Sequence, residues 1–264
     1  MSVTLADVRA VLDSLIDPNT GRPVGDAVKD SQIQLVGEYV SVRVDLGYPA
    51  ASQVDRLRGQ IYTALKAQGV SSPDVHVGTK IAAHAVQMGV TRVEGVRNII
   101  AVASGKGGVG KSTTAVNLAL ALQAEGARVG LLDADIYGPS VPLLLGVSVK
   151  PASLDGKKMV PIQGHGLQAN SIGFLMNDDT PAIWRGPMVV QALEQLLRQT
   201  AWDDLDYLII DMPPGTGDIA LTLAQSVPVV GAVIVTTPQD LALLDACSTH
   251  IHRIEVSKLK SEDC

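Results

Sequence analysis

The chain has 264 residues, of which 46% are hydrophobic and 18% are charged, and its formal net charge is −6. This composition predicts a packed core and excludes wholesale disorder, while the acidic balance argues against broad nucleic-acid binding. Aromatic residues make up only 3% of the chain, so the core must consist mainly of aliphatic side chains, as in buried parallel sheets. The length is sufficient for two modest domains.

The sequence contains no pattern that predicts export or membrane insertion. The N-terminal stretch carries Asp7 and Asp13 and has no basic region ahead of an apolar run, so it does not resemble a signal peptide. The longest apolar run, residues 227–235, is too short to cross a bilayer. The two cysteines, Cys247 and Cys264, imply no disulfide framework. We therefore expect a cytoplasmic protein with neither a membrane nor a nucleic-acid partner.

Residues 1–81 predict a small α+β domain. Apolar side chains in residues 4–16 recur at spacings of three and four, which indicates an amphipathic helix with Thr4 as its N-cap. Alternating apolar and polar residues then indicate strands, and a second periodic segment indicates another helix. In chain order, the expected helix, two strands, helix and strand are residues 4–16, 31–36, 39–46, 51–68 and 75–81.

Residues 82–97 are typical of a linker, residues 98–247 predict a larger α/β domain, and residues 248–264 form a divergent tail. In the larger domain apolar runs alternate with helical patterns, which implies right-handed crossovers and a mostly parallel sheet with helices on both faces. The expected strands are residues 98–103, 127–133, 207–211 and 229–236, and the expected helices are residues 113–124, 188–199 and 218–225.

Residues 105–113 read GKGGVGKST and fit the phosphate-loop pattern G-x-x-x-x-G-K-[ST], between an expected strand and an expected helix. Glycines let backbone N–H groups turn toward a polyanion, and the helix N-terminus adds partial positive charge. We expect Lys111 to reach the β- and γ-phosphates of ATP and the Ser112 hydroxyl to bind Mg²⁺; the alternative is a glycine-rich turn with a solvated lysine. The expected nucleotide-binding residues are Gly105, Lys106, Gly107, Gly108, Val109, Gly110, Lys111, Ser112 and Thr113.

Two further apolar runs end in carboxylates. Asp133 and Asp135 follow one expected strand, and Asp211 ends another. Because the carboxyl ends of parallel strands face the ligand crevice, these side chains are candidates for the phosphate site, although a polar strand end that faces solvent would look the same. We expect Asp211 to contact Mg²⁺ through water.

The segment after Asp211 reads MPPGTGD and resembles a switch loop. Gly215 and Gly217 would let this loop move when a γ-phosphate is present or absent. Asp218 can be read equally well as the cap of the next helix or as a catalytic residue.

The segment KGGVGKS resembles the deviant Walker A signature of the MinD, ParA and nitrogenase iron-protein class. This resemblance implies that Lys106 reaches across a dimer interface to the nucleotide of the partner, whereas without it Lys106 is an exposed loop lysine. It also implies that Asp135 orients or deprotonates the attacking water, with Asp133 holding either the magnesium shell or the loop. The expected catalytic residues are Lys106, Lys111 and Asp135, and the expected metal ligands are Ser112 and Asp211.

Together with DMPPGTGD, the segments DADIYGPS and WRGPM resemble the Mrp/ApbC family of iron–sulfur cluster carrier ATPases, over roughly residues 1–246. The resemblance implies ATP binding with slow hydrolysis, a homodimer, and transfer of a cluster to apo-proteins with the help of assembly scaffolds. Arg185 in the WRGPM segment is a candidate for switch coupling or for a structural salt bridge. The leading domain resembles iron–sulfur assembly factors of the SufT type. Residues 45–52 lack the cysteine that such domains often carry, so we expect a docking or scaffolding module.

The resemblance ends near Cys247. The family's C-x-x-C cluster ligands are absent from this sequence, which leaves the cluster implied by the family without its ligand pair and suggests a shortened or frame-altered C-terminus. Cys247, His250 and His252 are close in sequence, but a solvated tail explains them better than a metal site. Two alternatives to a cluster carrier remain: a ParA/MinD-like positioning ATPase, and a nucleotide-binding scaffold without a cluster.

Overall fold

The computed structural model describes residues 3–37, 39–86, 89–153, 156–175, 186–215 and 226–239. The chain divides into two compact units, residues 1–82 and 83–264, each of which has its own hydrophobic core. Among the residues described, no helix is long and apolar enough to cross a membrane.

The smaller unit contains the five expected elements in the expected order. A helix begins the unit, and β1 pairs antiparallel with β2, which pairs parallel with β3. The first strand starts later than expected because Asp30–Gln32 forms a 3₁₀ turn. The last strand begins at Ser72 and ends at Thr79, earlier than the expected residues 75–81. The elements are α1 (Leu5–Ser14), β1 (Ile33–Val36), β2 (Tyr39–Leu46), α2 (Ala51–Ala67) and β3 (Ser72–Thr79).

Local chemistry explains where this unit begins and what holds it together. Thr4 caps α1: its hydroxyl accepts a hydrogen bond from the Asp7 N–H, and the Asp7 carboxylate accepts one from the Thr4 N–H at 2.9 Å. Alternate residues of β2, such as Val42 and Val44, are fully buried and share one core cluster with Leu57 and Ile61 of α2, which recur four apart. Each such aliphatic side chain contributes about 1.5–3 kcal/mol on burial.

The larger unit contains a six-stranded sheet in the order β6-β7-β5-β8-β4-β9. Every pairing is parallel except that of β6 with β7, so the sheet is mostly parallel as expected. The elements are β4 (Val96–Ala103), α3 (Lys111–Ala124), β5 (Val129–Asp133), α4 (Val141–Leu145), β6 (Ile162–Gly164), β7 (Leu167–Ser171), α5 (Gly186–Arg198), β8 (Leu205–Asp211) and β9 (Gly231–Ile234).

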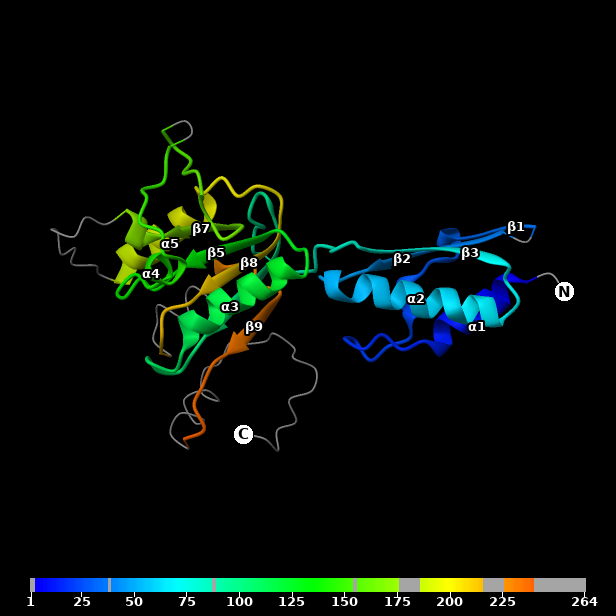
Figure 1. The fold of residues 1–264 in the computed structure, drawn as a ribbon. Coiled ribbons are helices and arrows are strands. Elements are labelled where there is room, and N and C mark those ends of the chain that lie inside the picture. The colour runs from blue at the N-terminus through cyan, green and yellow to red at the C-terminus, as the bar shows by residue number, and fades with distance from the viewer. Residues whose placement is uncertain are drawn as a thin grey trace. The chain divides into compact units, whose positions relative to one another are not determined.

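Helices cover both faces of this sheet (Figure 1). Leu132 of β5 and Ile210 of β8 pack in one cluster with Leu193 and Leu197 of α5. Side chains alternate across a strand, so the intervening residues point to the other face, where α3 contacts β4, β5 and β8. The expected helix at residues 218–225 lies outside the described residues.

An ion network ties together the amino ends of the central strands. Asp206 on β8 accepts hydrogen bonds from the Arg97 guanidinium at 2.7 Å and from the Arg128 N–H at 2.9 Å, and Asp204 pairs with both arginines. Burial by itself would raise the pKa of Asp206. The hydrogen bonds and charge of Arg128, together with the charge of Arg97, outweigh this effect, so the pKa lies below its ordinary value. Asp206 therefore stabilises the fold as an anion.

We expect Asp206→Asn to lower the free energy of unfolding by about 1.5–3 kcal/mol near neutral pH, because charged hydrogen bonds to both arginines are lost. A lowered carboxyl pKa stabilises the fold above the unfolded value of about 4, and this contribution is lost as the pH falls through the folded pKa. The difference between wild type and variant in urea denaturation should therefore shrink below about pH 4.

Asp203→Asn is the matched control, because the Asp203 hydrogen bonds to Gln168 use its backbone. Equal losses of stability in the Asp203 and Asp206 variants would contradict the assignment.

Candidate nucleotide site

The phosphate loop connects the end of β4 to Lys111, the first residue of α3. Gly108 and Gly110 have φ of 79° and 90°, in the left-handed region that favours glycine. A Cβ added at Gly107, Gly108 or Gly110 would meet no described atom within 4 Å, so the glycines leave an open cradle. The buried Ser104 holds the loop: its hydroxyl donates to the Lys106 carbonyl at 2.9 Å.

The side chain of Lys111 turns into the protein. Its ammonium lies 2.5 Å from Asp211 Oδ1 and 3.2 Å from Ser112 Oγ. The Lys111 side chain is 6% exposed and that of Asp211 is 0% exposed. Asp211 Oδ2 is buried and has no hydrogen-bond partner among the described residues. The structure thus brings the expected phosphate ligand together with both expected magnesium ligands.

Asp135 completes the group from the loop that follows β5. Burial raises the pKa of Asp135, the Lys111 ammonium opposes this, and the Asp211 carboxylate adds to it. The Asp135 carboxylate also accepts hydrogen bonds from the N–H groups of Tyr137 and Gly138. Lys111, Asp135 and Asp211 therefore lie within electrostatic range of one another at the carboxyl edge of the sheet.

Asp133 holds the loop that carries Asp135. Its carboxylate accepts hydrogen bonds from the N–H groups of Asp135, Ser140 and Val141, each at 3.1 Å, and from the Ser171 hydroxyl at 3.0 Å. Burial raises the pKa of Asp133 to about 6, against the Val141 N–H, which lowers it. Of the two roles left open by the sequence, these contacts fit the loop-holding one.

The other expected residues differ in what the structure says of them. Lys106 lies in the loop, with its ammonium 3.5 Å from Gln239 Oε1 of the same chain. The N–H of Gly215 donates to the Ser104 carbonyl at 2.9 Å, which ties the start of the switch loop to the phosphate loop.

Ser104, Ser171 and Gln239 have no place in the phosphate-loop pattern, so sequence spacing did not identify them. Gly105, Val109 and Thr113 occupy the loop and the first turn of α3.

Several candidates lie outside the described residues: Arg185, Gly217, Asp218, Cys247, His250 and His252. Within the described ranges, no group of three or more His, Cys, Asp or Glu side chains could hold a metal ion.

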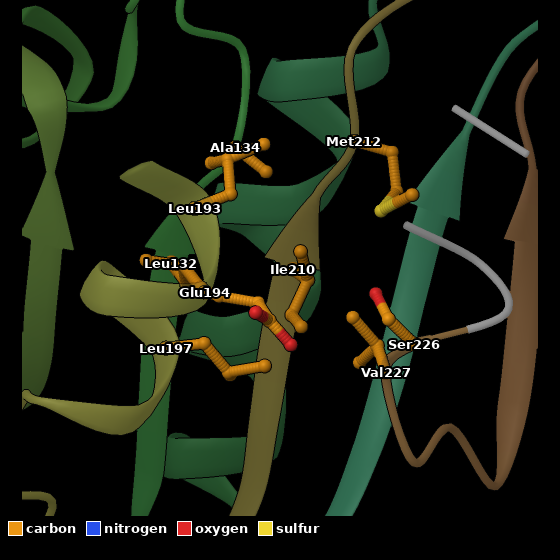
Figure 2. A pocket seen from close by; sticks show the side chains of 9 residues that line it. All are labelled: Leu132, Ala134, Leu193, Glu194, Leu197, Ile210, Met212, Ser226 and Val227. Atoms are coloured by element: carbon orange, nitrogen blue, oxygen red, sulfur yellow. The ribbon is translucent and has the colours of Figure 1, made fainter. Parts of the chain in front are cut away.

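A separate apolar cavity lies between α5 and the sheet (Figure 2). Leu132, Leu193, Ile210 and Val227 line it, and Glu194 supplies its one carboxylate. The lining residues that the structure describes offer no cation to a phosphate, and none of them belongs to the phosphate loop, so the cavity is distinct from the nucleotide site.

The fold and the loop define a P-loop nucleotide-binding domain, and family comparisons refine this class. Residues 95–256 match the ParA family, described as NUBPL iron-transfer P-loop NTPase, and residues 5–77 match the iron–sulfur cluster assembly protein family. The chain belongs to the NUBPL-type iron-transfer P-loop NTPase family.

Curated relatives support this assignment. The iron–sulfur cluster carrier protein of Haemophilus influenzae is 55% identical over 217 residues, which cover 81% of this chain and 59% of the relative. The protein of the same name from Escherichia coli K12 is 68% identical over 155 residues, or 58% of this chain and 42% of the relative. The chain spans between 42% and 63% of the length of these two relatives and of the iron–sulfur cluster carrier protein of Pseudomonas fragi.

A solved structure shares the fold. The nucleotide-binding protein of Archaeoglobus fulgidus, determined in complex with ADP, is 39% identical with a TM-score of 0.51, covering 60% of this chain and 63% of that chain.

For the ATP hydrolysis proposed in the next section, we expect Asp133→Asn to lower turnover by about 100-fold, while nucleotide affinity changes little. The amide would present an N–H₂ group to N–H donors, which would release the loop that positions Asp135 without touching the phosphate cradle. Wild-type turnover should also fall as the pH drops through about 6, because protonation removes acceptor capacity from Asp133. An acid limb that persists in Asp133→Asn belongs to Asp135, whose pKa burial also raises.

Steady-state kinetics with a separate ADP titration measures both effects. Ser171→Ala removes one of the four donors and should cost less. An affinity loss as large as the turnover loss would show that Asp133 acts on binding instead.

Proposed function

We propose that this chain binds ATP with Mg²⁺ and hydrolyses it slowly, and that this activity serves the assembly of iron–sulfur clusters and their transfer to apo-proteins. The observation that carries the proposal is the convergence of Lys111, Asp135 and Asp211 around one phosphate loop. Membership of an iron-transfer NTPase family and relatives named cluster carriers support the second part.

The loop suits a triphosphate. Its glycines and the N-terminus of α3 present N–H groups and partial positive charge, and Lys111 adds a full charge. We propose Gly105, Lys106, Gly107, Gly108, Val109, Gly110, Lys111, Ser112 and Thr113 as the nucleotide contacts.

The residues present also suit Mg²⁺. Asp211 Oδ2 is buried and has no hydrogen-bond partner among the described residues. The Lys111 ammonium contacts both Asp211 Oδ1 and the Ser112 hydroxyl, so the aspartate and the serine lie close together. Carboxylate and hydroxyl oxygens are ligands that Mg²⁺ accepts while keeping several waters. When bound, Mg²⁺ would neutralise charge on the phosphates.

Asp135 is the proposed general base. Burial raises its pKa toward the working range of a base, and the Tyr137 and Gly138 N–H groups fix its orientation. Lys106 is proposed to stabilise the γ-phosphate of a second copy, so the active form would be a homodimer. In the smaller unit, a docking role toward apo-proteins and assembly scaffolds fits the match of residues 5–77 to assembly proteins.

We expect Lys111→Ala to weaken ADP binding by about 10- to 100-fold, because a charged contact to the phosphates is lost. Asp135→Asn should retain the affinity but lower turnover by about 100-fold or more, because an amide cannot take the proton of the attacking water. Isothermal titration and phosphate release measure the two effects.

Lys158→Ala is the control, since Lys158 pairs with Glu94 outside the site. Unchanged turnover in both site variants would show that another site carries the activity.

The proposed cargo is tested by anaerobic reconstitution with iron and sulfide counted per chain. A cluster needs several thiolates, and the sequence contains only Cys247 and Cys264. In the proposed homodimer two chains together would supply four thiolates, so the proposal predicts bound iron that is lost in the double variant Cys247→Ser/Cys264→Ser. A chain that hydrolyses ATP but retains no iron would favour the positioning or scaffold alternatives.

A further inference from the structure

The loop that carries Asp135 is bounded on one side by the turn that follows β7. This turn is a short 3₁₀ helix, Ile172–Phe174, and the side chains of Ile172 and Phe174 are buried. Ile172 belongs to the same core cluster as Ile136 of the loop. The turn is therefore anchored in the core and presents a fixed surface to the loop.

Gly173, the middle residue of this turn, packs closely against its neighbours. A Cβ built on it would lie 3.1 Å from Pro139 Cβ, 3.1 Å from Pro142 Cγ and 3.2 Å from Ser171 Oγ. Carbon atoms pack best at about 3.5–4.0 Å, so at least one neighbour would have to move. The φ of Gly173 lies outside the left-handed region, so space and not backbone conformation explains the glycine.

The two prolines link this contact to the catalytic loop. Pro139 lies in the loop after Asp135, and Pro142 is the second residue of α4. A proline ring is closed onto its own backbone and fixes φ, so its atoms cannot swing aside as those of a long side chain can. Pressure from the turn would therefore pass to the backbone of the loop and to the start of α4.

Ser171 provides a second link between the turn and the loop. Its Oγ accepts a hydrogen bond from the Gly173 N–H at 3.0 Å and donates one to the Asp133 carboxylate at 3.0 Å. The same carboxylate accepts from the N–H of Asp135. A methyl group at Gly173 would press on the Ser171 hydroxyl as well as on the prolines, so both links act on one loop.

From this geometry we infer that Gly173 is a positioning residue for the hydrolysis of ATP. Its lack of a side chain lets the turn close on the loop and sets the place of Asp135. The inference rests on the proposed function and adds to it a residue that lies outside the phosphate loop. A displaced loop would move the proposed base relative to the attacking water, whereas the phosphate contacts would be retained.

The test compares Gly173→Ala with the wild type in ATP turnover and in ADP titration. We expect turnover to fall by about 10- to 100-fold while the ADP dissociation constant stays within about twofold. Gly231→Ala is the matched control, because a Cβ at Gly231 would meet no described atom within 4 Å. This control should behave as the wild type does.

Rescue separates positioning from a general loss of stability. Pro142→Ala removes the Cγ atom that the added methyl group would approach. The double variant Gly173→Ala/Pro142→Ala should therefore turn over about threefold or more faster than the product of the two single effects predicts. A variant that is merely destabilised would not be rescued by a second substitution in its packing.

Hydrogen–deuterium exchange reports the state of the loop without any turnover. The amides of residues 135–141 include the three N–H donors to Asp133, and they should exchange about tenfold or more faster in Gly173→Ala than in the wild type. Ser171→Ala, which adds no volume, should speed the same amides, so it decides the question should Gly173→Ala fold poorly.

Three results would overturn the inference: wild-type turnover and exchange in Gly173→Ala, a loss of ADP affinity as large as the loss of turnover, and no coupling between Gly173→Ala and Pro142→Ala. Failure of the proposed function is distinguishable, because it would show as absent ATP turnover in the wild type. The exchange comparison is made without nucleotide and is decided independently.

Discussion

The buried ion pair between Lys111 and Asp211 joins the first residue of α3 to the last residue of β8 across 100 residues of sequence. It can form only because β4 and β8 pair in parallel, with Val102 opposite Asp211. The same register places Asp133 of β5 opposite Asp211 on the other side. The phosphate loop, the switch loop and the loop after β5 therefore all leave the sheet at one edge, around a single carboxylate.

The burial of this pair makes its loss costly. Breaking a buried ion pair by removing one partner costs about 3–5 kcal/mol, so this contact holds the first turn of α3 against the end of β8. The glycines contribute an open backbone, whereas the ion pair fixes the start of α3 at the edge of the sheet.

The sequence predicts the large periodic elements well because their pattern is local: α2, β2 and the strand–loop–helix around Gly110 need no knowledge of the rest of the chain. It missed α4, β6 and β7, which are short and take their structure from long-range pairing, as when Gln163 pairs with Gln168 and Leu131 with Ala169. It also placed the three site groups at one strand edge, because parallel topology requires it. The sequence did not predict that Lys111 contacts Asp211, because the motifs assign Lys111 to a phosphate and Asp211 to Mg²⁺.

Asp133 and Asp135 show why contacts decide where patterns do not. Both carboxylates follow the same apolar run, and burial raises the pKa of both. β5 ends at Asp133, however, so Asp133 stays inside the sheet and accepts hydrogen bonds from the loop, α4 and β7. Asp135 lies beyond the strand, within electrostatic range of Lys111. The N–H of Val141, the first residue of α4, and the N–H of Asp135 both donate hydrogen bonds to the Asp133 carboxylate. A displacement of Asp135 must therefore either break a hydrogen bond to Asp133 or carry the start of α4 with it.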